Sequence, residues 1–257
     1  MPNRRTFIST GIASTGTVAF SGAVSAESSA DQTRVDGYNY RLPAFAKGSR
    51  LLFQGDSITD MKWGRNERDR NHFLGHSYVY LLAARLGIEL ADARLDFYNR
   101  GMSGHTVADL RKRWQKDAVD MHPDLLSILI GTNDVGRGVQ VESFESDYRH
   151  LLDVSLQANA ELRIVLLAPF VLQSGKLKDE QSWRSRREAT DKLGAVVSRI
   201  AKDYGAVLIE TQGIFDSAVD LAPAEHWIWD GVHPLPQGHE LIARHWLERV
   251  SARWPKT

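Results

Sequence analysis

The chain alternates between apolar and amphipathic segments from residue 50 onward, and no other feature limits the fold as strongly. Three of the apolar segments contain the runs Leu-Leu-Phe, Leu-Leu-Ser-Ile-Leu-Ile and Ile-Val-Leu-Leu. Nearly unbroken apolar runs are typical of strands in a parallel sheet that helices cover on both faces. We therefore predict five strands, at residues 50–54, 95–98, 125–130, 163–168 and 206–209.

Helical patterns lie between and after these strands. In one of them Val107, Leu110 and Trp114 follow at intervals of three and four, which places them on one face of a helix. The predicted helices are residues 77–86, 106–120, 141–157, 183–204 and 237–253. The alternation predicts an α/β fold, a three-layer α/β/α sandwich with a five-stranded parallel sheet, in one domain of residues 48–257.

The first residues are typical of an export signal. Arg4 and Arg5 form a twin-arginine start, a mildly apolar stretch follows, and Val24-Ser25-Ala26 offers small residues for a peptidase. We expect residues 1–26 to be a twin-arginine signal that is removed after Ala26, and residues 27–47 to be a loose polar linker. The alternative is an uncleaved membrane anchor, but seven Gly, Ser or Thr residues between Ser9 and Thr17 make a poor bilayer span. The mature protein is then periplasmic or extracellular, without a membrane attachment.

Composition excludes several classes of partner and site. With a formal net charge of zero over 257 residues, the chain lacks the basic footprint of a nucleic-acid-binding protein. It has no cysteine, so it forms neither disulfides nor a thiolate metal site.

Four short polar segments follow predicted strands or precede the last helix. Ligands of open α/β sheets bind beyond the carboxyl ends of the strands, so all four segments are expected at one edge of the sheet. The segments are Gly-Asp-Ser-Ile-Thr at 55–59, Asn-Arg-Gly-Met-Ser-Gly at 99–104, Gly-Thr-Asn-Asp at 131–134 and Asp-Gly-Val-His-Pro at 230–234.

Together these segments contain the groups that cleave an ester. Serine is a weak nucleophile until a base takes its proton, and the base needs a third group to orient it. We assign Ser57 as nucleophile, His233 as base and Asp230, three residues earlier, as the orienting carboxylate. Taken alone, Gly-Asp-Ser is equally typical of an ordinary turn, and an Asp-x-x-His pair is a weak signal.

An acyl-transfer site also needs hydrogen-bond donors for the oxyanion. The candidates are the Ser57 amide, the Gly104 amide and the Asn133 side chain. Gly101 competes with Gly104 for this role, both glycines can equally form a turn, and Asn133 can equally cap a helix. We assign Asp56 to structural support.

These segments resemble those of SGNH-fold, GDSL-type serine hydrolases, over residues 51–247. The one departure in the first segment is Ile58, where the family name implies leucine. The resemblance implies a flavodoxin-like fold and no cofactor or metal. It carries the family's functional positions onto Ser57, Gly104, Asn133, Asp230 and His233.

Within that family the chain resembles bacterial acetylxylan esterases, through residues 54–60, 75–79, 110–114 and 229–234. The resemblance implies an acetylated carbohydrate as substrate, and it leaves a homo-oligomer open because some members form large ring-like assemblies. For substrate binding we single out Trp229, Trp63 and His105, although large aromatic residues more often lie in a core.

Three other functions stay open. One is a general short-chain lipase or thioesterase of the same fold. The second is a metal-dependent hydrolase that uses His226, Asp230 and His233. The third is a sugar-binding protein that has lost catalysis.

Overall fold

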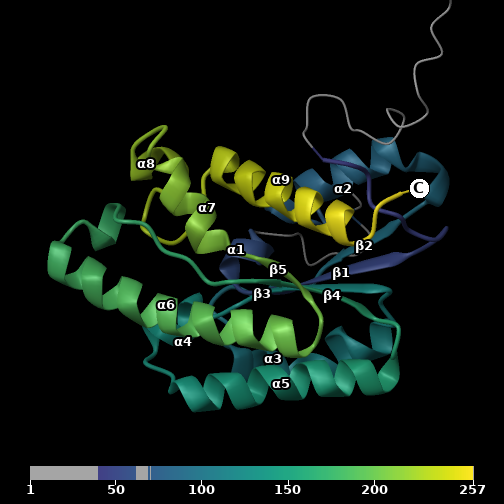
Figure 1. Cartoon of the computed structure of the whole chain (residues 1–257), viewed down its shortest axis with the longest axis horizontal. Helices are drawn as coiled ribbons and strands as arrows, with labels where there is room; N and C mark the ends of the chain where they lie inside the picture. Colours follow the sequence, from purple (N-terminus) through teal and green to yellow (C-terminus); the bar gives the residue numbers. More distant parts are fainter. Residues whose placement is uncertain (1–39, 62–68, 70, 257) are drawn as a thin grey trace, which may run out of the picture. The chain divides into compact units, whose positions relative to one another are not determined.

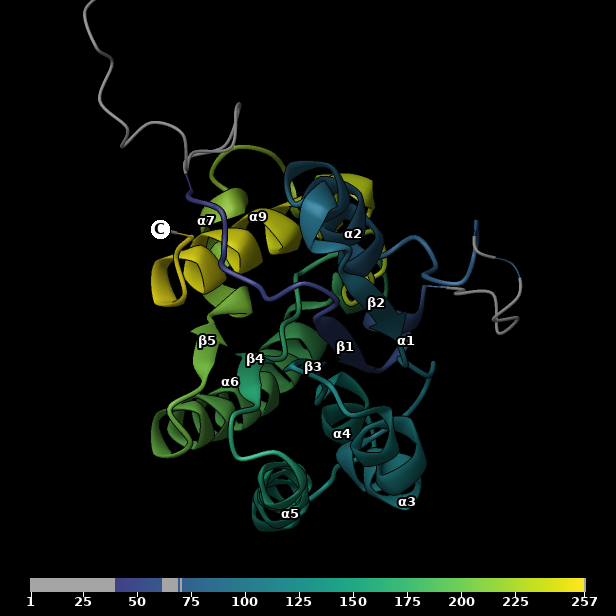
Figure 2. The same ribbon diagram turned by 90° about the vertical axis from the view of Figure 1, so that its right-hand side faces the viewer.

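A computed structural model describes residues 40–61, 69 and 71–256. In this part of the chain five parallel strands form one sheet in the order β2-β1-β3-β4-β5 (Figures 1 and 2). The strands are β1 (Arg50–Gly55), β2 (Asp96–Asn99), β3 (Leu125–Leu129), β4 (Arg163–Leu167) and β5 (Val207–Ile209). Each lies within one residue of its predicted bounds, so the predicted α/β fold is confirmed.

Helices cover both faces of the sheet (Figure 1). Alternate side chains of β1 enter opposite cores: Leu51 and Phe53 pack on one face and Leu52 on the other. Helices α2 (Tyr78–Glu89), α7 (Thr211–Ala218), α8 (Ala224–Trp227) and α9 (Pro236–Arg253) cover the first face. Helices α3 (Val107–Asp117), α5 (Val141–Ala158) and α6 (Glu180–Asp203) cover the second.

The ends of two long helices follow from their caps. Helix α3 begins with a capping box between Thr106 and Asp109, and it ends three residues before the predicted end, where the 3₁₀ helix η3 (Val119–Met121) follows. Helix α6 begins three residues before its predicted start because the Asp179 side chain accepts a hydrogen bond from the Ser182 amide.

Several shorter elements were not predicted. The elements concerned are α1 (Ser57–Asp60), α4 (Thr132–Gly136), α7, α8 and the 3₁₀ helices η2 (Ala91–Ala93), η3 and η4 (Gly175–Leu177). Most of them span one or two turns, too few residues for a helical period to show in the sequence.

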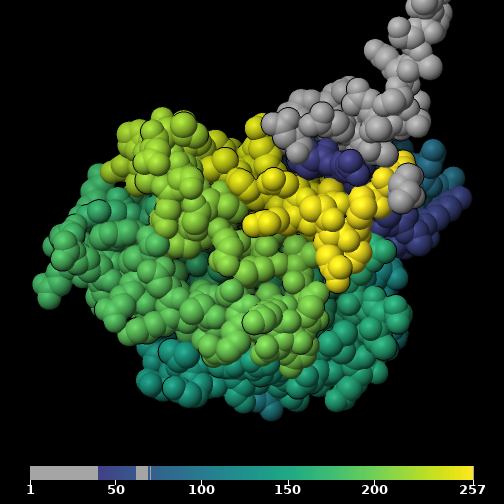
Figure 3. Space-filling view, in the orientation of Figure 1, coloured from purple at the N-terminus to yellow at the C-terminus, as the bar shows by residue number. Residues whose placement is uncertain are grey.

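Residues 40–47, assigned to the linker from the sequence, are part of the folded domain. Tyr40 and Leu42 are buried in the core, and Pro43 forms an isolated β-bridge with Pro255. The Ala44 amide also donates to the Trp254 carbonyl at 2.8 Å. In Figure 3 the purple start of the described chain lies against the yellow C-terminal segment. Residues 40–47 therefore belong to the domain and not to the linker; the rest of the predicted linker and the predicted signal lie outside the described residues.

The strand order places a switch point between β1 and β3, because the chain leaves β1 toward β2 on one side and returns to β3 on the other. Crevices beyond such switch points bind the ligands of doubly wound sheets. The turns after β1, β2 and β3 contain Ser57, Gly104 and Asn133. Among the described helices, none has the length and apolar character needed to cross a membrane.

Candidate active site

Ser57 lies at the turn between β1 and α1 and is the first residue of that helix. The preceding residue, Asp56, is the N-cap, and its Oδ1 accepts a hydrogen bond from the Ile58 amide at 3.0 Å. Because the first amides of a helix have no acceptor within it, the Ser57 N–H is available at the edge of the sheet.

Ser57, His233 and Asp230 form a continuous chain of hydrogen bonds. The Ser57 Oγ lies 2.7 Å from His233 Nε2, and His233 Nδ1 lies 2.7 Å from Asp230 Oδ2. A carboxylate only accepts, so His233 Nδ1 donates and its Nε2 accepts the serine proton. The imidazole is thus in the tautomer that a general base requires.

Asp230 is itself fixed by its own loop. Its Oδ1 accepts hydrogen bonds from the amides of His233 at 2.8 Å and Val232 at 3.0 Å. Burial acts to raise the pKa of Asp230, but the hydrogen bonds from the His233 amide and ring and from the Val232 amide outweigh it, so the pKa lies below its ordinary value. The carboxylate therefore stays ionised when the histidine gains a proton.

The loop after β4 supports the Asp230–His233 turn, a role with no signal in the sequence. The Leu172 amide donates to the Gly231 carbonyl at 3.0 Å, and the Ser174 hydroxyl donates to the Ile228 carbonyl at 2.5 Å. Ile228 also forms a β-bridge with Pro234, so the turn is closed on both sides of the histidine.

Two glycines of the segment after β2 differ in what their amides do. The Gly101 N–H donates to Asn99 Oδ1 at 2.9 Å, and a Cβ on Gly101 would lie 2.5 Å from the Asp60 nitrogen. Gly104 has a φ of +82°, and its N–H has no hydrogen-bond partner among the residues that the structure describes. The geometry favours Gly104 as the oxyanion donor and gives Gly101 a packing role.

Asn133 lies in α4, directly after β3, and connects to the same loop. Its Nδ2 donates to the His105 carbonyl at 3.0 Å, which uses one of its two amide hydrogens and leaves the other for a ligand. Asp134, given no role from the sequence, accepts the Val107 amide with both carboxylate oxygens, at 3.1 and 3.3 Å. It thereby joins α4 to the first turn of α3.

Two buried carboxylates lie beside these groups. Burial raises the pKa of Asp56 to about 7, against the lowering effects of the Ile58 amide and the His233 charge. Burial likewise raises the pKa of Asp134 to about 6, despite the hydrogen bond from the Val107 amide. The cap that Asp56 forms agrees with the structural role expected for it.

Comparison with known proteins decides the family. The model of the GDSL-like lipase/acylhydrolase family matches residues 53–241. The chain belongs to this family. An acetylxylan esterase of Geobacillus stearothermophilus is 32% identical over 222 residues, which cover 82% of this chain and 97% of that protein.

Solved structures agree with this assignment. A Parabacteroides merdae protein described as a GDSL-like lipase has a TM-score of 0.76 at 35% identity, covering 82% of this chain and 99% of that one. A structure of the Geobacillus acetylxylan esterase has a TM-score of 0.71 at 31% identity and covers 82% and 98% of the two chains. The resemblance to the SGNH hydrolases is confirmed, and this GDSL-like protein is a carboxylic ester hydrolase.

The three residues expected to bind substrate lie in different surroundings. In this GDSL-like hydrolase Trp229 is 59% exposed beside Asp230, as a wall residue of the site would be. The main chain of His105 supports Asn133, while its ring nitrogen Nδ1 accepts from Arg113 Nε at 3.4 Å. Trp63 lies outside the described residues, as does most of the charged loop around it.

The three side chains considered as metal ligands, His226, Asp230 and His233, do not converge on one point in this hydrolase. His233 bonds to Ser57 and Asp230, whereas the His226 ring packs edge-on against Trp227 with ring centroids 4.7 Å apart. Among the described residues, no group of three or more histidine, aspartate or glutamate side chains is placed to hold a metal ion.

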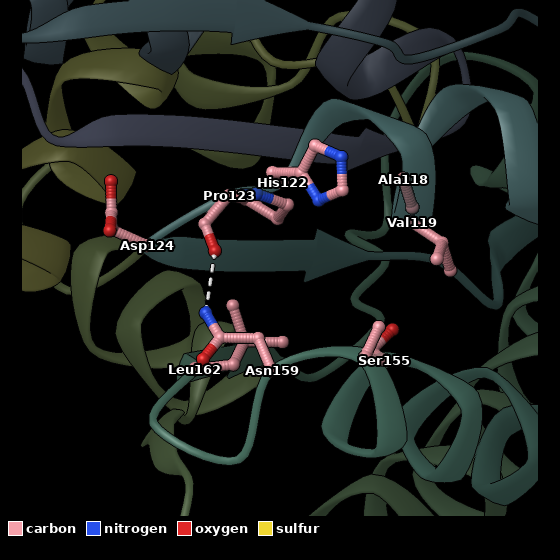
Figure 4. Close-up of a pocket in the computed structure, with 9 residues that line it drawn as sticks. Ala118, Val119, His122, Pro123, Asp124, Ser155, Asn159 and Leu162 are labelled. Atoms are coloured by element: carbon pink, nitrogen blue, oxygen red, sulfur yellow. Dashed lines mark hydrogen bonds between the residues drawn. The ribbon is translucent and has the colours of Figure 1, made fainter.

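A separate hollow lies at the amino ends of β3 and β4, at the edge of the sheet opposite the site (Figure 4). It has a volume of about 290 Å³ and lies between the η3 turn and the end of α5. The Asn159 Nδ2 donates to the Pro123 carbonyl at 3.1 Å, and Asp124 Oδ2 accepts the Arg50 amide at 2.7 Å. We assign no ligand to this hollow because the Ser155, Asp124 and Asn159 side chains bond to the protein itself.

Proposed function

We propose that this hydrolase is a serine esterase that removes short acyl groups, above all O-acetyl groups, from carbohydrates such as acetylated xylan fragments. The observation that carries the proposal is the hydrogen-bonded chain from Ser57 through His233 to Asp230, with 2.7 Å at each step.

The reaction follows from this geometry. His233 Nε2 takes the Ser57 proton as Oγ attacks the ester carbonyl, and Asp230 stabilises the imidazolium. The amides of Ser57 and Gly104 and the Asn133 side chain donate to the oxyanion. His233 then protonates the leaving sugar oxygen, and the acyl group stays on Ser57. A water molecule, deprotonated by His233, then attacks the acyl-enzyme; the bond between the acyl carbon and Ser57 Oγ breaks, His233 returns the proton to Oγ, and acetate is released.

The relatives support both the triad and the substrate class. Three structures of the Geobacillus acetylxylan esterase are described as catalytic mutants, in which a serine, an aspartate or a histidine is replaced by alanine. The aspartate and the histidine are three positions apart in that enzyme, as Asp230 and His233 are in this chain.

The test is acetate release from acetylated xylan, acetylated pectin and simple acetylated sugars, together with a series of aryl esters of increasing acyl length. We expect acetyl to be preferred, acetate to be released from xylan, and EDTA to leave the rate unchanged. Preference for long acyl chains or thioesters favours a general lipase or thioesterase, and loss of activity with EDTA favours a metal-dependent hydrolase. Sugar binding without acetate release identifies a binding protein.

Ser57→Ala tests the nucleophile, with Ser155→Ala as its matched control. Removing such a serine reduces kcat by about 10⁶-fold in a comparable triad enzyme. Ser155 is also a hydrogen-bonded serine, but it lies in the last turns of α5. Its hydroxyl accepts from Trp114 Nε1 and donates to the Leu151 carbonyl. Ser155→Ala is expected to cost about 1–3 kcal/mol of stability and leave kcat unchanged. Activity that survives in Ser57→Ala would refute the mechanism.

We also propose that residues 1–26 direct export by the twin-arginine route, on the basis of Arg4, Arg5 and the small residues before Glu27. Replacing both arginines by lysine is expected to retain the protein in the cytoplasm. The mass of the exported protein reports whether cleavage follows Ala26, and export without Arg4 and Arg5 contradicts the proposal.

A further inference from the structure

A buried carboxylate joins the nucleophile helix to the segment that contains Gly104. Asp60, the last residue of α1, is 3% exposed. Its Oδ2 accepts two hydrogen bonds from one residue, from the Ser103 amide at 2.9 Å and from the Ser103 hydroxyl at 2.5 Å. Asp60 thus fixes both the main chain and the side chain of the residue before Gly104.

An arginine holds the other side of the same glycine. Arg137, directly after α4, donates from Nη2 to the Gly104 carbonyl at 2.6 Å and from Nη1 to Asp109 Oδ2 at 3.3 Å. Its position is four residues after Asn133, so the helix that contains one oxyanion donor also anchors the loop that contains another.

The peptide between Ser103 and Gly104 is the one whose N–H points to the oxyanion in the proposed function. Glycine loses more conformational freedom on folding than any other residue, and Gly104 has a φ of +82°. An unsupported amide here would sample many orientations. Donors stabilise a transition state most when they are already oriented before the reaction.

We propose that Asp60 and Arg137 are positioning residues that clamp this peptide from both sides and so orient the Gly104 N–H toward the oxyanion. The proposal rests on the proposed function, in which Gly104 is a donor. In this proposal each residue acts through a hydrogen bond and not through a contact with the substrate: Asp60 binds Ser103, and Arg137 binds the Gly104 carbonyl.

The clamp predicts a loss in kcat and not in substrate binding. The ester carbonyl becomes a strong acceptor only in the transition state, so a misdirected donor weakens the transition state more than the ground state. A displacement of about 1 Å in such a site can reduce the rate about 10²-fold. A residue with a purely structural role would instead lower the melting temperature and leave kcat unchanged.

The experiment compares Asp60→Asn, Ser103→Ala and Arg137→Gln on an aryl acetate, with kcat, KM and melting temperature measured for each. We expect kcat to fall about tenfold in Asp60→Asn and in Arg137→Gln, with KM within about twofold. Ser103→Ala retains the amide bond to Asp60 and is expected to lose less. The double variant Asp60→Asn/Arg137→Gln is expected to approach the loss of one donor, about 10²–10³-fold.

The matched controls remove similar ion pairs elsewhere. Arg149 joins Glu145 and Asp203, and Asp216 binds Arg187; neither pair touches the site segments. Arg149→Gln and Asp216→Asn are expected to keep the wild-type kcat. Arg137 is 57% exposed, so its variant is expected to fold even if Asp60→Asn does not.

An unchanged kcat in folded Arg137→Gln, or a rise in KM alone, overturns the clamp. Ser57→Ala measured in parallel separates the two proposals. If Ser57→Ala is inactive while the clamp variants keep kcat, the clamp alone is refuted. If Ser57→Ala keeps its activity, the proposed function is refuted, and the clamp with it.

Discussion

The two ends of the sheet contain the same four types of side chain in different arrangements. At the carboxyl end they form the candidate active site, and at the amino end they line the hollow of Figure 4. The first set is Ser57, His233, Asp230 and Asn133; the second is Ser155, His122, Asp124 and Asn159.

The difference lies in what these side chains bond to. At the amino end, Ser155, Asn159 and Asp124 bond to main-chain groups or to the Trp114 indole. At the carboxyl end the serine and the histidine bond to each other, and one hydrogen of the Asn133 amide is left over. The types of residue present therefore do not decide where the site is. The site lies where these side chains bond to one another and leave hydrogen-bond donors for a ligand.

The largest expected difference is between the two aspartates. In the proposed mechanism Asp230→Asn removes the charge that stabilises the imidazolium and turns the ring to the wrong tautomer, so kcat is expected to fall about 10⁴-fold. Asp124→Asn changes a carboxylate at the amino end that accepts the Arg50 amide, and kcat is expected to stay at the wild-type value. Steady-state kinetics on an aryl acetate measure both.

An equal fall in kcat in the two aspartate variants would contradict the comparison. It would mean that removing a carboxylate charge at either end of the sheet affects catalysis. A folded Asp230→Asn variant with wild-type kcat would remove Asp230 from the mechanism.

The two asparagines are expected to differ less. Asn133→Ala removes one of the proposed oxyanion donors, and the loss of such a donor reduces kcat about 10²–10³-fold. Asn159→Ala removes the bond to the Pro123 carbonyl and is expected to cost about 1 kcal/mol of stability with unchanged kcat. Chemical denaturation and kinetics together distinguish the two effects. A loss of stability without a loss of kcat in Asn133→Ala would make it a structural residue like Asn159.

The sequence predicted the sheet and the edge where the site lies, for a physical reason. Leu51, Leu52 and Phe53 are all fully buried, and such runs are typical of strands that helices cover on both faces. Three of the four polar segments directly follow strands and the fourth directly precedes the last helix, so their common location was predictable without any contact.

The supporting contacts could not be predicted in this way. Asp60 and Ser103 are 43 residues apart, and neither has a spacing that indicates a partner. Tyr40, Leu42 and Phe45 pack on the domain, but the short segment that contains them shows neither a helical nor a strand period that would predict this packing. Contacts of this kind depend on the tertiary fold, which a local pattern does not encode.

The last expected effect concerns stability and not the reaction rate, and it sharpens the same comparison. Asp56 is 1% exposed, and burial raises its pKa from 3.8 to about 7. Since the folded state holds this proton more tightly than the unfolded state, the charged form destabilises the fold as pH rises from about 4 to about 7, by up to about 1.4 kcal/mol for each pH unit. Asp56→Asn keeps the helix cap and removes this titration.

We therefore expect the free energy of unfolding of Asp56→Asn to rise relative to that of the wild type between pH 4 and pH 7. Above pH 7 the difference between the two is expected to stay constant. Urea denaturation at a series of pH values measures the difference. Ser155→Ala is the control, because it lowers stability without removing a titrating group, so its curve should run parallel to that of the wild type. A parallel curve for Asp56→Asn would mean that the pKa of the Asp56 carboxyl is the same in the folded and the unfolded protein, and that the buried environment behind Ser57 is as well solvated as the surface.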